Sequence, residues 1–294
     1  MPNWVYNKVI LQGEKSAVHE FVKIGLKNSK IESTGDLERD FKWLIKEAKC
    51  GCIDGNGNLT HLEKGLTART FLPLPETFRI YDTTNYPDKY PDAAKEQMEK
   101  YGAVGWYDYN KKTLGTKWDF KLGVNEPPVL ENLSGDIWRI VFLCDTAWCS
   151  PTEWLVAVKN MVPQLHVMYM SHETGCWWFD VNEVIESGDN VYMDYTPMAD
   201  YLLNEYNEKR EKREKEIRAD AKLLESIYKK ATRNADGSVV LGSPFSEERH
   251  EQIENNATRI IEDMLDDEFG AWVNLDSVYE NMEKSLEELS EKYI

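Results

Sequence analysis

The stretch IWRIVFLCDTAWCSPTEWLVAVKNMVPQLHVMYM, residues 137–170, decides the fold. Residues 137–143 are almost entirely apolar, which predicts a strand covered on both faces. Pro151 can open a helix, because a missing N–H costs least in the first helical turn. The apolar residues that follow at helical spacing give this helix one buried face: Trp154, Leu155, Val158 and Met161. Residues 164–170 then predict the next strand.

The N-terminal part repeats the pattern of strand followed by helix. Residues 4–11 read as a strand that stops at Gly13, and residues 16–26 place Val18, Phe21, Val22 and Leu26 on one helical face. A turn at 173–175 leads into a further strand at 176–179. Strand–helix, strand, strand–helix–strand is the split βαβ order of a ferredoxin-like sandwich. We therefore expect an α+β domain, a ferredoxin-like split βαβ sandwich, over residues 1–195.

An insertion interrupts this domain at about residues 28–66. It contains one short predicted helix at 37–49 and a strong turn signal at 54–58. Residues 93–101 predict another helix later in the domain.

Residues 196–294 predict an all-α C-terminal region. Residues 199–231 contain no Gly or Pro, and 208–216 are charged on every face, which is typical of an exposed helix with i,i+4 ion pairs. A short a/d seam follows, and at barely two heptads it favours an intramolecular helix hairpin over a coiled coil. Its members are Ile217, Ala221, Leu224, Tyr228 and Ala231. After a break at 233–238, further helices are expected from Ser246 and over 275–293.

The charge is concentrated at the C-terminal end. Lys and Arg number 35 against 52 Asp and Glu, a net charge of −17, and residues 246–294 hold 15 acidic and 4 basic side chains, a balance of −11. Such a field repels nucleic acid and favours a basic partner surface. The sequence has no run of about 18 apolar residues, so we expect no membrane span. Its N-terminus lacks a basic-then-apolar region, so we expect no signal peptide. Five cysteines, an odd number, predict reduced thiols in a cytoplasm.

One group of residues could form a ligand-binding or active site. Paired carboxylates can do acid–base work when one has a raised pKa, and tryptophans could hold a ligand. Aromatic-flanked polar residues more often anchor a core through indole and carboxylate hydrogen bonds, so a structural role is favoured. The candidate ligand-binding residues are Trp106, Asp108, Lys117, Trp118, Asp119 and Trp148, with Asp145 beside them.

Metal and nucleophile motifs are incomplete. Cys50-x-Cys52 with His61 lacks a fourth zinc ligand. The run at 54–58 resembles the start of a calcium loop but continues with Leu59 and Gly65 where Gly and Glu are needed. His166 and His172 have no nucleophile at a readable spacing, and the flanking glycines of a nucleophile elbow are missing around Ser150. We therefore expect no metal, no cofactor and no catalytic residue.

Several motifs together resemble the YubB-type ferredoxin-like domain family of phages and conjugative plasmids, over about residues 1–185. The motifs are Met1-Pro2-Asn3-Trp4, Phe71-Leu72-Pro73, Trp106-Tyr107, Gly115-Thr116-Lys117-Trp118-Asp119 and Thr146-Ala147-Trp148-x-x-Pro151. Three positions depart from the family pattern: Val5 replaces a frequent Cys, Leu114 replaces Trp, and the closing Phe-x-Gly is only partly recovered at Trp178-Phe179-Asp180. The resemblance implies a fold and a mobile-element context, and no established enzymatic activity.

These observations favour a non-enzymatic protein that binds a host protein with a basic surface and inhibits an anti-phage defence system. Docking of acidic helices or DNA mimicry would serve this role. A second possibility is an enzyme or small-ligand binder that uses the Trp/Asp group, and a third is an assembly protein whose C-terminal helices form homo-oligomers. The candidate partner-binding residues are Glu262, Asp263, Asp266, Asp267 and Glu268.

Overall fold

The computed structural model describes residues 3–53, 59–123, 126–173, 175, 177–185, 190–228, 232–233, 239–240 and 275–294. Within 49–64, 190–192 and 220–240 the description covers the backbone alone. The chain divides into two compact units, Met1–Thr196 with Tyr279–Ile294, and Pro197–Val278. The C-terminal residues 279–294 thus group with the first unit, whereas the sequence-based prediction placed them with the rest of 196–294.

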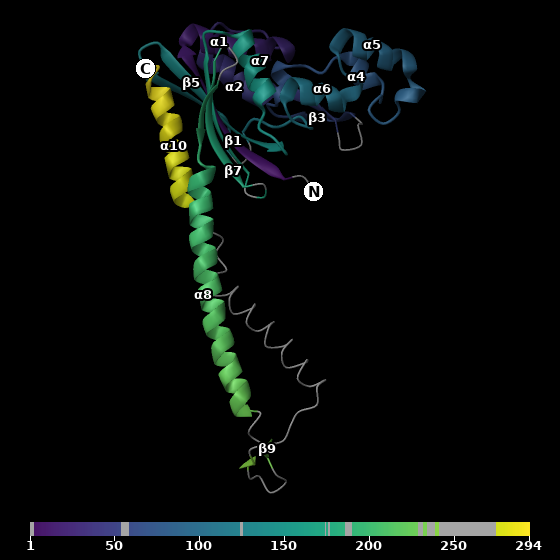
Figure 1. Cartoon of the computed structure of the whole chain (residues 1–294). Coiled ribbons are helices and arrows are strands. Elements are labelled where there is room, and N and C mark those ends of the chain that lie inside the picture. Colours follow the sequence, from purple (N-terminus) through teal and green to yellow (C-terminus); the bar gives the residue numbers. More distant parts are fainter. Residues whose placement is uncertain are drawn as a thin grey trace. The chain divides into compact units, whose positions relative to one another are not determined.

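The first unit is built on a six-stranded antiparallel sheet with the order β4-β5-β1-β6-β7-β8 (Figure 1). The strands are β1 (Trp4–Glu14), β4 (Val129–Ser134), β5 (Ile137–Ala147), β6 (His166–Glu173), β7 (Trp178–Val184) and β8 (Asn190–Asp194). The four strands predicted at 4–11, 137–143, 164–170 and 176–179 are confirmed as β1, β5, β6 and β7. The unit is therefore a mixed α/β structure, and β1 lies in the interior of the sheet between β5 and β6.

Helices cover one face of the sheet. Alternation along β1 places Val9 and Leu11 in the main core on this face. They pack with α1 (Lys15–Asn28), α7 (Thr152–Met161) and the short α3 (Ala68–Phe71). Phe21 stacks on Phe71 with ring centroids 4.1 Å apart. The predicted helices at 16–26 and from Pro151 are confirmed as α1 and α7.

The insertion packs onto this core through α2 (Leu37–Glu47), which confirms the helix predicted at 37–49. Leu37, Phe41 and Leu44 are buried in the main core cluster. Asp40 is fully buried on the same helix and accepts hydrogen bonds from His19 of α1 and from the Ser33–Thr34 loop. A two-stranded sheet follows, β2 (Lys49–Ile53) with β3 (Leu59–Lys64), and the predicted turn at 54–58 lies outside the described residues.

A smaller cluster lies beside the main core. It is formed by α4 (Glu76–Ile80), the 3-10 helix η1 (Pro87–Lys89), α5 (Pro91–Tyr101) and α6 (Gly105–Leu114). The predicted helix at 93–101 is confirmed as α5. Leu74, Phe78, Ala103 and Trp106 form the buried centre of this cluster.

The second face of the sheet is covered by α10 (Asp276–Glu291) (Figure 1). Met282, Leu286 and Leu289 of α10 are buried. On β1, the Gln12 amide nitrogen donates to the Ser290 carbonyl at 2.9 Å. On β5, Arg139 bridges Glu131 at 2.5 Å and Glu287 at 2.6 Å. The acidic last helix therefore pairs part of its charge with cations of the sheet.

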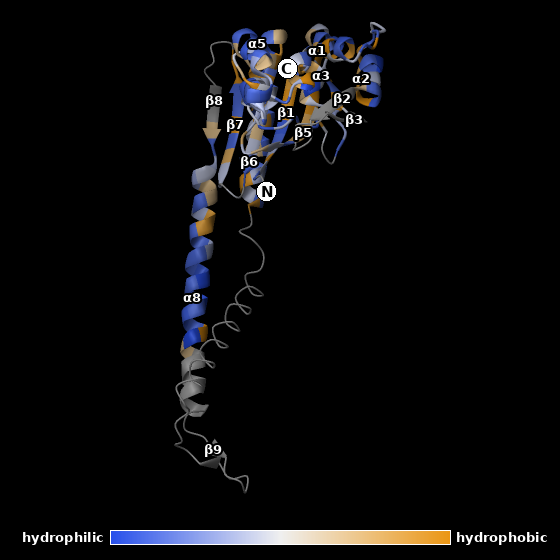
Figure 2. Ribbon diagram, turned by 90° about the vertical axis from the view of Figure 1, so that its right-hand side faces the viewer, coloured by the Kyte–Doolittle hydropathy of each residue, from blue (hydrophilic) through white to orange (hydrophobic). Residues whose placement is uncertain are grey.

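The second unit contains α8 (Thr196–Tyr228), whose described surface is mostly hydrophilic (Figure 2). Lys209–Glu205 and Arg218–Glu214 form i,i+4 ion pairs at 2.7 Å, which confirms the predicted charged, exposed helix. The side chains of the a/d seam beyond residue 219 and the helix predicted from Ser246 lie outside the described residues. Two short strands, β9 (Thr232–Arg233) and β10 (Val239–Val240), pair with each other, so the region is not purely helical as predicted. Among the described residues, no helix combines the length and apolar character needed to cross a membrane.

Candidate functional site

The residues of the predicted Trp/Asp group lie in several different environments. Trp106 is buried in the smaller cluster, and Trp118 packs against the same cluster. Asp108 is exposed on α6, whereas the Oδ2 atom of Asp119, in the segment after α6, is buried. Asp145 pairs with Tyr6 across the strands, and burial raises its pKa. The three candidate carboxylates therefore differ in exposure, and no two of them are joined by a hydrogen bond among the described residues.

Asp119 belongs instead to a buried polar network with Arg69. Its Oδ1 accepts backbone hydrogen bonds from Arg69 at 3.2 Å and Phe120 at 2.9 Å. Among the described residues, Oδ2 is buried without a hydrogen-bond partner. Burial raises the pKa of Asp119 to about 6, and the side chain of Thr67 and the nearby Arg69 charge partly offset this effect. The carboxylate is thus held in place at a cost in free energy.

The Arg69 guanidinium ties α3 to α6. It donates to the Leu72 carbonyl at 2.9 Å, to Thr113 Oγ1 at 3.1 Å and to Asn110 Oδ1, and it lies over the Tyr109 ring. Burial lowers its pKa to about 10, so it stays protonated at neutral pH. A buried charged group with several hydrogen-bond acceptors is typical of an anchor between elements.

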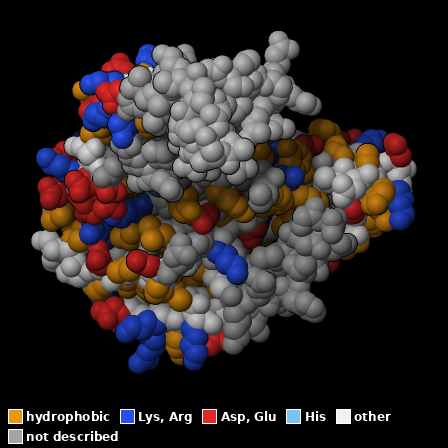
Figure 3. Space-filling model, turned by 90° about the horizontal axis from the view of Figure 1, so that it is seen from below, with side chains coloured by type: hydrophobic (Ala, Val, Ile, Leu, Met, Phe, Trp, Pro, Cys, Tyr) orange, Lys and Arg blue, Asp and Glu red, His pale blue; other side chains and the backbone are white. Residues whose placement is uncertain are grey.

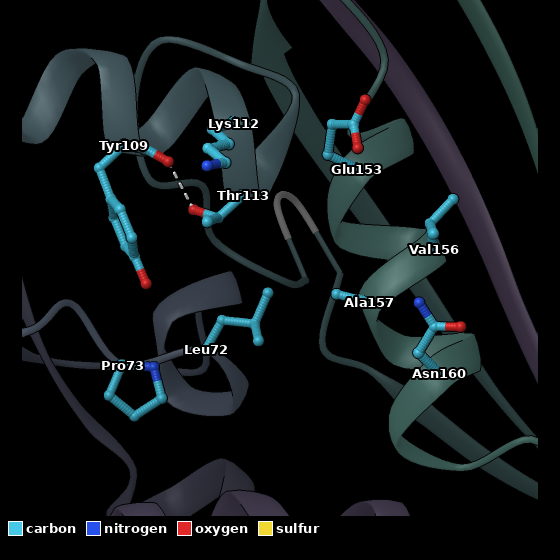
Figure 4. A pocket seen from close by; sticks show the side chains of 9 residues that line it. All are labelled: Leu72, Pro73, Tyr109, Lys112, Thr113, Glu153, Val156, Ala157 and Asn160. Carbon is cyan, nitrogen blue, oxygen red and sulfur yellow. Dashed lines mark hydrogen bonds between the residues drawn. The ribbon is translucent and has the colours of Figure 1, made fainter. Parts of the chain in front are cut away.

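A cavity of about 340 Å³ lies between α6, α7 and the segment after α3 (Figure 4). Thr113 donates a hydrogen bond to the Tyr109 carbonyl on its α6 wall. Lys112 is engaged with the Tyr101 carbonyl at 2.8 Å. The residues that line the cavity are Leu72, Pro73, Tyr109, Lys112, Thr113, Glu153, Val156, Ala157 and Asn160. Lys112, the cation among the described lining residues, already donates to a backbone carbonyl, so this cavity is a weak candidate for an anion site.

The aromatic side chains at one end of the sheet are more informative. Trp4 pairs with Ala147 across β1 and β5, and the next residue, Trp148, donates its backbone N–H to the Asn3 carbonyl at 2.9 Å. Trp4, Tyr6 and Trp148 are 49%, 49% and 51% exposed. The Trp118 ring lies 6.0 Å from that of Trp4. We call Trp4, Tyr6, Trp118 and Trp148 the aromatic rim.

Trp4 and Tyr6 of the rim lie at the start of β1, the strand next to the N-terminus in Figure 1. Figure 3 views the molecule from below and shows hydrophobic side chains gathered among Lys, Arg, Asp and Glu. Tyr6 also stacks on His172 at 5.1 Å, and burial lowers the pKa of this histidine to about 4. His172 is therefore neutral at physiological pH and serves as an aromatic neighbour of the rim.

A buried polar row crosses the strands behind the rim. Asn7 donates to Thr146 Oγ1 at 3.0 Å and accepts from Ser171 at 2.7 Å. Ser171 pairs with Asp180 on β7, and burial raises the pKa of Asp180 to about 7. The row therefore runs across the sheet from β5 through β1 and β6 to β7.

Other predicted chemistry is not assembled in the described part of the chain. No group of three or more His, Cys, Asp or Glu there could hold a metal. The side chains of Cys50, Cys52 and His61 and the run at 54–58 lie outside that part, as do Glu262, Asp263, Asp266, Asp267 and Glu268. Cys144 is buried, which raises its thiol pKa, and Cys149 is exposed.

Sequence reasoning missed Arg69, Asn110 and Asp180. Arg69 and Asn110 stand 41 positions apart, so no local pattern connects them. Asp180 lies where the closing Phe-x-Gly motif is only partly recovered. Its carboxylate, in place of the Gly of that motif, was the one sequence feature that could have indicated a functional role.

Comparison with known proteins gives no identity. No family model matches the sequence, and no curated protein matches it. A solved structure, that of the protein api92 from Yersinia pseudotuberculosis, assigned to the family model DUF1281, shows a weak likeness at 10% identity and a TM-score of 0.29. The likeness covers 66% of this chain and 98% of that one. At this TM-score it supports neither a fold assignment nor a function.

Proposed function

We propose that this chain is a non-enzymatic protein of a phage or mobile genetic element that binds a host protein in the bacterial cytoplasm and inhibits an anti-phage defence system. The aromatic rim is the observation that carries the binding role. Trp and Tyr are enriched among the residues that dominate protein–protein binding energy. Exposed aromatic side chains grouped at one end of a sheet have no evident role in the core, so they favour a docking surface.

The arrangement of the sheet supports the family context. Strands β4-β5-β1-β6, with α1 after β1 and α7 between β5 and β6, have the order expected of a ferredoxin-like sandwich. We propose that β7 and β8 extend this sandwich. The motif resemblance to the YubB-type domain, carried by phages and conjugative plasmids, then suggests the mobile-element context and a cytoplasmic site of action.

Acidic charge favours a partner with a basic surface. Residues 275–294 hold six acidic and two basic side chains, and Glu283 and Glu287 pair with Lys8 and Arg139 of the sheet. Most of the excess acidic charge of 246–294 therefore comes from residues 246–274, which include Glu262, Asp263, Asp266, Asp267 and Glu268. We propose that these carboxylates contribute long-range attraction while the rim supplies the short-range contact.

The test is affinity purification of the tagged full-length chain from a bacterial host that carries diverse defence systems. The double variant Trp4→Ala/Trp148→Ala removes rim side chains that are about half exposed. Trp43→Ala is the matched control, since Trp43 is 43% exposed on α2, away from the rim. We expect one stoichiometric host protein with the wild type and the control, and its loss with the rim variant.

Charge is tested by substitution. Deleting 246–294 would remove α10 and uncover the sheet, so loss of binding would only report unfolding. Replacing the five candidate acids at 262–268 with Asn or Gln leaves the sequence of α10 unchanged. High salt should slow partner association with the wild type, and we expect this slowing to be smaller with that variant. Equal recovery of the partner by the wild type and the rim variant would contradict the docking surface. Recovery of a homo-oligomer alone would favour the assembly role.

A further inference from the structure

A cavity of about 490 Å³ opens beside the aromatic rim, between the loop after β5, the start of α7 and the start of β7. Its volume falls in the range of small-ligand sites, about 300–1,000 Å³. Two tryptophans, Trp148 and Trp178, and two carboxylates, Glu153 and Asp180, contribute to its lining, together with the hydroxyl side chains of Ser150 and Thr152. Among the described lining residues there is no Lys, Arg or His.

Asp180, a lining residue of this cavity, is short of hydrogen-bond partners. Its carboxylate is hydrogen-bonded to the Ser171 backbone and to Asn182. Its Oδ1 is nevertheless buried without a hydrogen-bond partner among the described residues. Asp194 pairs with it across β7 and β8, which adds a second negative charge nearby. A buried carboxylate oxygen beside another negative charge costs free energy of folding unless a hydrogen-bond donor or a cation pairs with it.

We propose that this cavity binds the guanidinium group of an arginine side chain. This inference rests on the proposed function, because the arginine would belong to the host protein that docks on the aromatic rim. Guanidinium stacks on indole faces and bonds carboxylates through paired N–H donors, a combination that matches Trp148, Trp178 and Asp180. Ammonium groups lack the planar fork, so lysine is the poorer fit.

The partial positive charge at the start of α7 disfavours a cation in this cavity, so it has to be compared with the negative charges of the lining. A helix N-terminus carries about +0.5 elementary charge, and α7 has no side-chain cap there. Glu153 in its first turn and Asp180 across the cavity each contribute a full negative charge when ionised. The net field in the cavity therefore favours a cation.

Trp148 is held in a strained conformation that exposes its indole. Its φ is +72°, a region that costs a bulky residue of order 1–3 kcal/mol. The backbone hydrogen bond from Trp148 to the Asn3 carbonyl, at 2.9 Å, maintains it. Such strain is often kept where a side chain must be presented for binding.

The test uses the full-length chain and two small probes, N-acetyl-arginine methylamide and its neutral isostere N-acetyl-citrulline methylamide. Binding is measured by ¹⁹F NMR of 5-fluorotryptophan-labelled protein, with Trp148→Phe and Trp178→Phe used to assign the two signals. We expect both signals to shift with the arginine probe and not with citrulline. Asp180→Asn should weaken arginine binding about tenfold or more, whereas Asp108→Asn, at an exposed aspartate of α6, should not change it.

A pH series on the wild type keeps the inference testable if Asp180→Asn fails to fold. Burial raises the pKa of Asp180 to about 7, and the charged groups that face it are Glu153 of α7 and Asp194 of β8. The ionised fraction then rises about tenfold from pH 6 to pH 8, and arginine binding should tighten by a similar factor. Equal binding of citrulline, or no pH dependence together with an unaffected Asp180→Asn variant, would overturn the site.

The two proposals can fail separately, because this experiment needs no partner protein. Arginine binding without recovery of a host protein would leave the site standing and remove the proposed function. Recovery of a host protein without arginine binding would overturn the site and leave docking to the rim alone.

Discussion

Asp40 offers the sharpest test of how the insertion is held on the core. Its Oδ1 accepts from the Thr34 backbone and hydroxyl at 2.8 and 2.7 Å, and its Oδ2 accepts from His19 Nε2 at 2.8 Å and from Ser33. Removing a fully buried carboxylate with such partners leaves several donors unpaired, which costs about 3–5 kcal/mol. We therefore expect Asp40→Ala to lower the free energy of unfolding by about this amount.

Urea denaturation followed by tryptophan fluorescence measures the effect. A loss of about 3–5 kcal/mol corresponds to a fall in Tm of roughly 6–20 °C for a unit of about 200 residues. Asp36→Ala is the control on the same helix, because Asp36 is the exposed N-cap that accepts from Arg39 at 2.8 Å, and such a cap contributes about 1 kcal/mol. If the two variants lose equal stability, the reasoning about the buried network is refuted.

The same network predicts a pH dependence. Burial alone would raise the pKa of Asp40, but hydrogen bonds from Ser33, His19 and Thr34 hold it well below its usual range. The stabilisation is therefore present above about pH 4, the value of the unfolded chain, and is lost as the pH falls further. Asp40→Asn should flatten the decline of stability at acid pH, which denaturation midpoints between pH 2 and 6 would measure.

Three further predictions concern other parts of the first unit. Leu286→Ala on α10 should cost about 2–5 kcal/mol, because the side chain is fully buried; thermal melts by circular dichroism would show it, and no change would mean that α10 does not cover the sheet. Gly105→Ala should destabilise by more than about 1 kcal/mol, since φ is +80° and a Cβ would lie 2.5 Å from the Thr84 backbone nitrogen; the same melts test it, and a neutral result would contradict this close approach. Because the pKa of Asp119 is raised to about 6, the free energy of unfolding should fall by about 3 kcal/mol as the pH rises from about 4 to about 6. Identical pH profiles for the wild type and Asp119→Asn would contradict this.

Local periodicity predicted the elements that build the core. The apolar run at 137–143 and the helical spacing of Trp154, Leu155 and Val158 are short-range patterns, and β5 and α7 follow them closely. The edge strands β4 and β8 have no comparable apolar signal and were not predicted. Register, likewise, depends on which distant strands pair, as Trp4 does with Ala147.

The candidate site could be predicted only in part, for the same physical reason. Trp118 and Trp148 were identified from the sequence, and both lie in the aromatic rim. Grouping Asp108 with Asp119 assumed that residues near in sequence share an environment, whereas one is exposed and the other buried. The role of Asp180 depends on Asp194 and α7, which are placed only by tertiary packing.

The contact between Gln12 and Ser290 has a consequence for synthesis in the cell. These residues stand 278 positions apart, yet their hydrogen bond joins an interior strand to the helix that covers it. The sheet is complete only after β8 ends at Asp194, so one of its faces stays uncovered while about 100 further residues are made. At about 5–20 residues per second this takes about 5–20 s. During that interval the nascent sheet exposes apolar surface. The yield of folded protein should therefore depend on chaperones more strongly than the stability of the finished fold suggests.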